Sequence, residues 1–349
     1  MYKTGIWRLV SARRLQKPSL RDVTSYQLLK KIGADDPKHV EIFETIVRHL
    51  RLSSGIYRST YRRRFADLDP VVNAILREVF TAPVLEAHDW AASDCLASAE
   101  WAESLWTAFP RARVIASDTL LCLIEVSCKR QKEAYVFEPD GTPLQYIRPP
   151  FVLSLQKAIP RYYPVNRIVG AWAKRGLRQA QQAALQRTPP SAAPASNNPA
   201  ATGMAKERRA AQAKAQRWNV EEIDLVHPLA RRLAAKDIRF EARLHSVFTA
   251  LAAPGHVIRT MNILNRGYFD ESRLRLAVNC VLESLVDGGI WVVGRTREER
   301  VPPYNSASIF QKAGRAFKLL RRLNEGSEIE ALVLSASAPD QRPTGIAAR

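Results

Sequence analysis

The sequence predicts an α/β protein whose sheet is mostly parallel and ends in antiparallel strands. The first observation is a strand, a turn of small residues, a helix and a second strand within residues 84–118, which is a βαβ unit. The second is the return of short apolar runs after Trp218, separated by a helical pattern at 270–286. The strands expected there are 222–226, 238–244, 256–264, 289–295 and 328–334. Strands that alternate with helices favour a parallel sheet.

Composition limits the class of protein. The chain has 349 residues, of which 46% are hydrophobic and 25% charged, so global disorder and a fibrous structure are excluded. No apolar run approaches the ~20 residues that cross a bilayer. The four cysteines form neither a metal-ligand pattern nor a disulfide framework, which is typical of a reducing compartment. We therefore expect a cytoplasmic protein without a membrane partner.

The N-terminal part, residues 1–80, is predicted to be basic and then helical. Residues 1–21 carry six Lys/Arg and no acid, and a frayed basic terminus is favoured over a transit peptide because no cleavage site is evident. Apolar residues then recur at helical spacing over 25–80. Asp69-Pro70 opens a further helix, since proline is favoured at a first helical position.

An α/β domain is expected over residues 81–335, interrupted by an insertion at 127–218. The insertion contains a β-hairpin at 134–147, a long helix-like stretch at 151–186 and a linker at 188–205. The linker holds four prolines and no charged residue, as flexible segments do. Antiparallel strands around residues 324–326 are expected to close the domain, followed by a flexible tail, 336–349.

Three features predict a ligand site. A turn of small residues, Asp89–Cys95, follows one strand, Asp118 closes the next, and a polar segment, 257–269, precedes a Gly-Gly turn at 288–289. In an open parallel sheet the ligand lies beyond the carboxyl ends of the strands, where the chain order reverses. A carboxylate there can accept hydrogen bonds from ribose hydroxyls, so these features predict a nucleoside-type cofactor site.

Plainer interpretations compete with this one. The 89–95 turn can be an ordinary loop with Ser93 or Asp94 as helix N-cap, and only the register with Asp118 and the Gly-Gly turn favours a site. Asn262 and Asn265 can equally satisfy backbone groups at a strand end. The six histidines are scattered, so no metal site is predicted.

On these residues the chain resembles class I S-adenosylmethionine-dependent methyltransferases, over roughly 70–126 and 236–335. The first motif of that family is acid-x-Gly-x-x-x-Gly, and Asp89, Ala91 and Cys95 fall on its positions. Alanine at 91 avoids a clash of its Cβ only at negative φ. The run NILNRGYFDESRL with GGIWVVGRTREE is also similar, locally, to chemotaxis-receptor methyltransferases.

The resemblance implies a Rossmann-like methyltransferase sheet, S-adenosylmethionine as cofactor and a methyl-accepting substrate that the sequence does not identify. It implies catalytic roles for Asn262 and Asn265, at the end of the fourth strand, where the substrate should lie. The cofactor-binding residues that it implies are Asp89, Ala91, Ser93, Cys95, Asp118 and Ser246. Ser246 stands where such proteins usually carry the acid that contacts adenine.

Two alternative functions remain open. Because Ala91 and Cys95 replace the two glycines, the chain can be a degenerate, non-catalytic member that acts as a binding or regulatory protein. The net charge of +19 favours a polyanion, so nucleic acid is a candidate partner. About half of that excess lies in residues 166–218, with ten Lys/Arg and one acid, so any such contact is expected through this basic segment.

Overall fold

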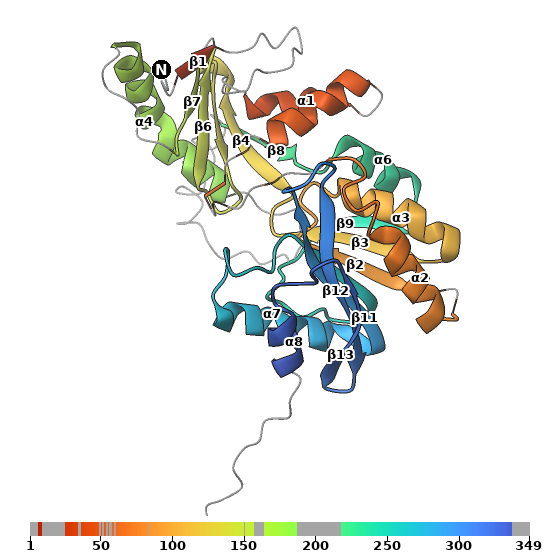
Figure 1. Cartoon of the computed structure of the whole chain (residues 1–349). Helices are drawn as coiled ribbons and strands as arrows, with labels where there is room; N and C mark the ends of the chain where they lie inside the picture. Colours follow the sequence, from red (N-terminus) through yellow and green to blue (C-terminus); the bar gives the residue numbers. More distant parts are fainter. Residues whose placement is uncertain are drawn as a thin grey trace, which may run out of the picture. The chain divides into compact units, whose positions relative to one another are not determined.

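The computed structural model describes most of the chain and divides it into two compact units (Figure 1). Unit 1 comprises residues 1–59 and 120–228, and unit 2 comprises 60–119 and 229–349. The chain thus leaves unit 2 after one βαβ segment and returns to it about a hundred residues later, in contrast to the boundaries expected at 80/81 and 127/218. The described residues are 6–8, 25–33, 36–48, 50, 52–53, 55, 58, 61–82, 84–149, 151–156, 164–186 and 218–336.

Unit 2 is built on a seven-stranded sheet with the order β13-β12-β11-β10-β2-β3-β9. Five neighbouring strands are parallel, and the last two are antiparallel. The parallel strands are β2 (Glu86–Trp90), β3 (Arg113–Asp118), β9 (Phe240–Leu244), β10 (Gly255–Met261) and β11 (Leu285–Arg297); the antiparallel ones are β12 (Tyr304–Ala313) and β13 (Ala316–Leu323). This arrangement confirms the predicted fold class, a Rossmann-like, mostly parallel sheet with antiparallel C-terminal strands.

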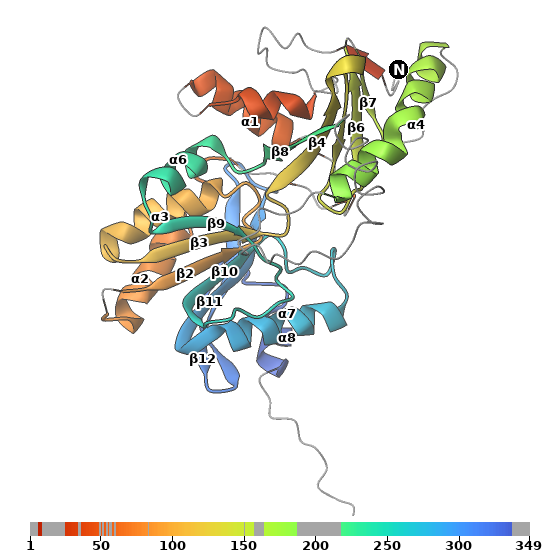
Figure 2. The same ribbon diagram turned by 180° about the vertical axis from the view of Figure 1, so that it is seen from behind.

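Helices cover both faces of this sheet (Figures 1 and 2). On one face lie α2 (Asp69–Val79), α3 (Leu96–Ala108) and α6 (Pro228–Lys236); on the other lie α7 (Glu271–Ser284) and α8 (Glu330–Ala336). The core under α7 and α8 is a cluster around Trp90, Ile258 and Trp291. Strands buried on both faces are continuous apolar runs, which is why β10 and β11 stand out in the sequence.

The strand order fixes where a ligand can lie in unit 2. From β2 the chain passes through α3 to β3 and outward toward β9, whereas β10 lies on the other side of β2 and leads through α7 to β11. The order therefore reverses between β2 and β10, and the crevice of a doubly wound sheet lies at the carboxyl ends of the strands at this switch point.

Unit 1 is an antiparallel sheet of six strands in the order β1-β7-β6-β5-β4-β8. Successive side chains of a strand point to opposite faces, and each face has its own apolar cluster. One face packs on η1 (Tyr26–Lys31) and α1 (Pro37–Arg48), and the other on α4 (Pro164–Leu185). The strands are β1 (Ile6–Arg8), β4 (Cys122–Cys128), β5 (Glu133–Phe137), β6 (Pro143–Arg148), β7 (Phe151–Ser154) and β8 (Asn219–Asp224), with η2 (Lys129–Gln131) after β4.

The structure confirms the hairpin at 134–147, which is β5 and β6 joined by a turn with Gly141 at φ 86°. The helix predicted for residues 151–186 is wrong in its first part, because strand β7 precedes helix α4. The strand near 222–226 is β8, which belongs to the antiparallel sheet of unit 1. The linker at 188–205, residues 337–349 and most of 1–21 lie outside the described residues.

The antiparallel C-terminal strands are present, but the predicted position of their turn and the predicted last strand are wrong. The closing hairpin turns at Gly314, between β12 and β13, and residues expected as a strand at 328–334 form helix α8. Ile329, Leu332 and Val333 lie at helical spacing and pack on the cluster under α7. Within the described ranges, the helices are all too short or too polar to span a bilayer.

Candidate functional site

The loop that follows β2 has an unusual backbone. Ala91, Ser93 and Cys95 have φ values of 57°, 57° and 65°, in the left-handed region that disfavours residues with a Cβ. Ala91 therefore does not adopt the negative φ at which its Cβ would avoid a clash. Cys95 is the N-cap of α3 and gives it no side-chain hydrogen bond, while Asp94 Oδ1 accepts one from the Leu96 N–H at 3.1 Å. The loop keeps the geometry that glycines would adopt, although neither residue at the two glycine positions is glycine.

The side chains at the two glycine positions pack into the protein. Ala91 packs against the apolar cluster that contains Trp90, and Cys95 is fully buried. Their Cβ atoms therefore contribute to the core of unit 2, and the left-handed backbone of the loop is retained at the carboxyl end of β2.

Asp118, the last residue of β3, holds this loop in place. Its Oδ2 accepts a hydrogen bond from the Ser93 N–H at 2.8 Å, and the Ser117 carbonyl accepts one from the Ala92 N–H at 2.9 Å. The carbonyl of Asp118 also accepts the His245 N–H at 3.0 Å, which ties the end of β9 to the same point. The structure thus brings Asp118, Ser93 and the residues after β9 together at one edge of the sheet.

Asp89 lies beneath the loop and is 3% exposed. It forms a two-point ion pair with Arg259 of β10, with Nε to Oδ1 at 3.0 Å and Nη2 to Oδ2 at 2.5 Å. Ser98 Oγ donates to Asp89 Oδ2 at 2.6 Å, and Arg259 Nη1 reaches Asp69 Oδ1 at 2.7 Å. The carboxylate of Asp89 is therefore engaged inside the protein and supports the loop from below.

Arg259 and Asp69 are site residues that sequence reasoning missed. Arg259 is completely buried, between the rings of Trp101 and Phe65 at 4.3 and 4.7 Å. An arginine in the middle of an apolar strand is itself a signal, since a buried charge needs a partner. The sequence alone does not say which of its carboxylates supplies that partner.

Two aromatic rings meet at the carboxyl ends of β2 and β9. Trp90 and His245 have ring centroids 4.6 Å apart. Trp90 Nε1 and His245 Nε2 are both buried and have no hydrogen-bond partner among the residues that the structure describes. Burial, and then the charge of Arg243, lowers the pKa of His245, so the imidazole is neutral near pH 7.

Ser246 follows His245 and is half-buried. Its Oγ accepts a hydrogen bond from the Phe248 N–H at 3.2 Å, so the hydroxyl shapes the turn after β9. The ring of Phe248 packs edge-on against Phe269 at 5.0 Å, which brings the loops after β9 and β10 together. A role for Ser246 in contacting a ligand stays a prediction.

Asn262 and Asn265 both use their amides to shape the loop after β10. Asn262, at φ 64°, accepts the Thr296 N–H at Oδ1 (2.7 Å) and so joins the end of β10 to β11. Asn265 Oδ1 accepts the N–H groups of Gly267 and Tyr268 at 3.0 and 3.1 Å. These bonds match the plainer interpretation of the two residues, and their catalytic role remains a prediction. In the described part of the chain no cluster of side chains could hold a metal ion.

Among known proteins, the matches to this chain are solved structures. No protein-family model and no curated protein matches the chain. Similar solved structures include an amino pentose methyltransferase of calicheamicin biosynthesis from Micromonospora echinaspora (11% identity, TM-score 0.27), an O-methyltransferase family protein from Burkholderia thailandensis (11%, 0.28) and a sugar N-methyltransferase from Streptoalloteichus (11%, 0.28). They align with 72%, 75% and 78% of this chain, which spans 66%, 42% and 82% of their lengths.

All three of these solved structures are named as methyltransferases. At these TM-scores the fold assignment rests on the strand order and connections of unit 2.

Proposed function

We propose that unit 2 is an S-adenosylmethionine-dependent methyltransferase, with the cofactor at the carboxyl ends of β2 and β3. One observation carries this proposal: three residues of the loop at 91–95 have left-handed backbone conformation at the switch point. Asp118 holds the loop there by accepting a hydrogen bond from the Ser93 N–H. A residue with a Cβ at positive φ costs roughly 1–2 kcal/mol, and three occur within five positions. Strained backbone of this kind concentrates at functional sites.

The residues present fit a nucleoside cofactor. The Cβ atoms of Ala91 and Cys95 pack inward, so they leave the loop backbone able to approach a ligand. Trp90 and His245 supply two buried ring nitrogens that have no partner among the residues the structure describes, and buried polar groups normally have one. Asp118 and the loop would hold the ribose of the cofactor. The Trp90–His245 pair and Ser246 would hold its purine.

Bound S-adenosylmethionine would supply a methyl group on a sulfonium centre. Methyl transfer is an in-line displacement, so the task of the protein is to position the reactants. Asn262 and Asn265 serve this task by ordering the loop after β10, where the acceptor is expected. A general base is needed only for an acceptor whose proton has a high pKa. The acceptor is unidentified; the four cysteines, at 95, 122, 128 and 280, form no disulfide, which favours an acceptor in a reducing compartment.

Calorimetric titration of the full chain with S-adenosylmethionine tests the proposal. We expect saturable binding that the Asp118→Asn variant weakens by about tenfold or more, since asparagine can still accept the Ser93 N–H but offers one oxygen fewer. Glu103→Gln, on the exposed face of α3, is the matched control and should leave the affinity unchanged. No binding at millimolar cofactor would reject the proposal.

A non-catalytic protein is the second candidate, and the engaged amides of Asn262 and Asn265 favour it. An assay with S-adenosylmethionine labelled on its methyl group distinguishes the enzyme from the non-catalytic protein. The protein is incubated with the labelled cofactor and, in three separate reactions, with small-molecule, protein or RNA fractions. Transfer of label to any fraction supports the enzyme, and cofactor binding without transfer supports the regulatory protein. Label in the RNA fraction would also support the nucleic-acid partner expected from segment 166–218.

A further inference from the structure

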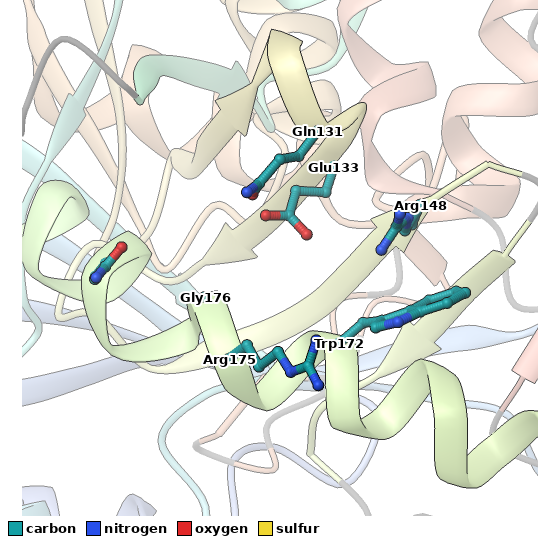
Figure 3. Close-up of a pocket in the computed structure, with 7 residues that line it drawn as sticks. Gln131, Glu133, Arg148, Trp172, Arg175 and Gly176 are labelled. Carbon is teal, nitrogen blue, oxygen red and sulfur yellow. The ribbon is translucent and has the colours of Figure 1, made fainter.

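Unit 1 contains a cavity of ≈ 440 Å³ between its sheet and helix α4 (Figure 3). Its lining comes from the β4–β5 connection, from β5 and β6, and from one face of α4. The lining residues are Gln131, Glu133, Arg148, Trp172, Arg175, Gly176 and Gln179. This volume is within the ~300–1,000 Å³ of small-molecule sites.

The helix reaches the sheet closely because Gly176 lacks a side chain. A Cβ at this position would lie 2.5 Å from the hydroxyl of Tyr135, and that hydroxyl donates to the Ala173 carbonyl at 3.0 Å. The wall of the cavity is therefore built from a fixed helix–sheet contact.

The charges that line the cavity are not balanced. Arg148 and Arg175 are two cations, and Glu133 is the one acidic residue of the lining. Neither arginine forms an ion pair within the described ranges of the chain. The cavity therefore has an excess of one positive charge, which an anionic ligand would neutralise.

The guanidinium of Arg148 is positioned to bind a planar anion. Its guanidinium lies over the ring of Trp172, 4.1 Å from the centroid. The Arg148 side chain also hydrogen-bonds to Tyr146. Stacking occupies only the face of the guanidinium, so its other in-plane N–H groups can bind a carboxylate with two hydrogen bonds. Figure 3 shows Arg175 extending from α4 toward the same space.

Glu133 is the acceptor on the opposite wall, and its carboxylate points into the space (Figure 3). It is 8% exposed, and its Oε2 accepts the hydroxyl of Tyr146 at 2.9 Å. Burial, and then the bond to Glu133, raises the pKa of Tyr146, so this hydroxyl stays a donor at any physiological pH. Among the described residues, no hydrogen bond is made to Oε1, so this carboxylate oxygen can accept one from a ligand in the cavity.

We propose that this cavity binds a small organic carboxylate that carries a hydroxyl or ammonium donor at its other end. The carboxylate lies between Arg148 and Arg175, and the donor bonds to Glu133. The site belongs to unit 1 and makes no use of the proposed cofactor site. Its failure would therefore leave the methyltransferase proposal unaffected.

The test is calorimetric titration of the full chain, without S-adenosylmethionine, with two hydroxy acids and two amino acids. D-gluconate and quinate represent the hydroxyl donor, and 4-aminobutyrate and 6-aminohexanoate, whose ammonium groups are at the end opposite the carboxylate, represent the ammonium donor. We expect one class to bind, and D-glucitol, which lacks the carboxylate, to give no heat. Arg175→Gln should weaken the binding by about tenfold or more. Arg178→Gln, an exposed change on α4 that does not line the cavity, should have no effect.

Glu133→Gln distinguishes the two donors, because loss of the charge weakens an ammonium ligand more than a hydroxyl ligand. Three results would overturn the proposal. The first is no heat with any of the four acids at about 10 mM. The second is equal loss in Arg175→Gln and Arg178→Gln. The third is binding of inorganic phosphate as tight as that of the best acid, which would show a simple anion site.

Discussion

Arg259 and Asp89 form a buried two-point ion pair across neighbouring parallel strands, at register partners of β10 and β2. The acid that the resemblance assigned to the cofactor motif is thereby committed to the interior of unit 2. Its negative charge is balanced within the protein, and Asp69 adds a second carboxylate to the same arginine. The ion-pair network of Arg259, Asp69 and Asp89 lies in the core and also supports the loop of the proposed cofactor site. We therefore expect both the stability of unit 2 and the binding of a ligand to depend on this network.

Replacing Arg259 by methionine is expected to destabilise the protein strongly. Asp69 and Asp89 would lose their common partner while remaining buried, and breaking such a network costs about 3–5 kcal/mol. Arg113→Gln breaks an exposed pair with Glu241 and should cost about 0–1 kcal/mol. Urea unfolding of both variants measures the difference, and equal losses would contradict the importance of burial here.

Asp69 should make the stability of the protein depend on pH. Burial raises its pKa to about 7, with Arg259 acting in the opposite direction, whereas the unfolded chain has the ordinary value of 3.8. The folded state therefore favours the protonated carboxyl. This contribution to the free energy of unfolding is fully present below about pH 4 and is lost as the pH rises through about 7, by about 4 kcal/mol at most.

Asp69→Asn tests this dependence because asparagine is neutral throughout. Urea unfolding between about pH 4 and 8 should show a flatter profile for the variant than for the original chain. Parallel profiles would indicate that another group titrates. Asp237, half-buried and paired with Arg239, gives a control variant, Asp237→Asn, whose profile should keep the slope assigned to Asp69.

The sequence predicts the sheet edge of unit 2 well because local patterns determine it. Apolar runs define β2, β3 and β10, and the small-residue turn and Asp118 mark where the first two of these strands end. The Arg259–Asp69 pair is different, since its partners are 190 positions apart and no local pattern joins them. The short apolar run at Ile329–Val333 fits a strand or a helix equally, and only its packing on α7 decides.

Unit 1 shows the same limit at the level of a whole sheet. Its hairpin, β5–β6, is local and was predictable from the turn at Pro139-Asp140-Gly141. The two outer strands of the sheet come from distant parts of the chain: β1, at its start, pairs with β7, and β8, near position 220, pairs with β4. Pairing over such separations is set by burial of the two faces, which a single sequence does not reveal.

Relief of backbone strain gives a third prediction. Ala91→Gly should stabilise unit 2 by about 0.5–1 kcal/mol, because glycine adopts φ 57° without a Cβ penalty. Ala99→Gly, within α3, should instead destabilise it by about 1 kcal/mol, as glycine does in a helix. Thermal unfolding of the two variants should show shifts of opposite sign. A loss of stability in both would mean that the packing of the Ala91 side chain outweighs the strain.

The last prediction concerns Asn265. A catalytic role and a structural role of this residue predict different effects of its substitution on methyl transfer. Asn265 Oδ1 accepts the N–H groups of Gly267 and Tyr268, while Nδ2 donates to the Ile263 carbonyl at 3.2 Å. Asn265→Ala removes both acceptor bonds and should speed hydrogen exchange of the amides at 267 and 268. The cost should be about 1 kcal/mol, confined to this loop.

Asn265→Asp is the matched variant, because a carboxylate oxygen accepts the same two N–H groups. If the residue shapes the loop, the aspartate variant restores slow exchange and keeps most of any methyl transfer, since only the bond to Ile263 is lost. If the amide N–H contacts the acceptor, methyl transfer falls in the aspartate variant although the loop is ordered. Exchange and transfer measured on the same two variants therefore separate a positioning residue from a catalytic one.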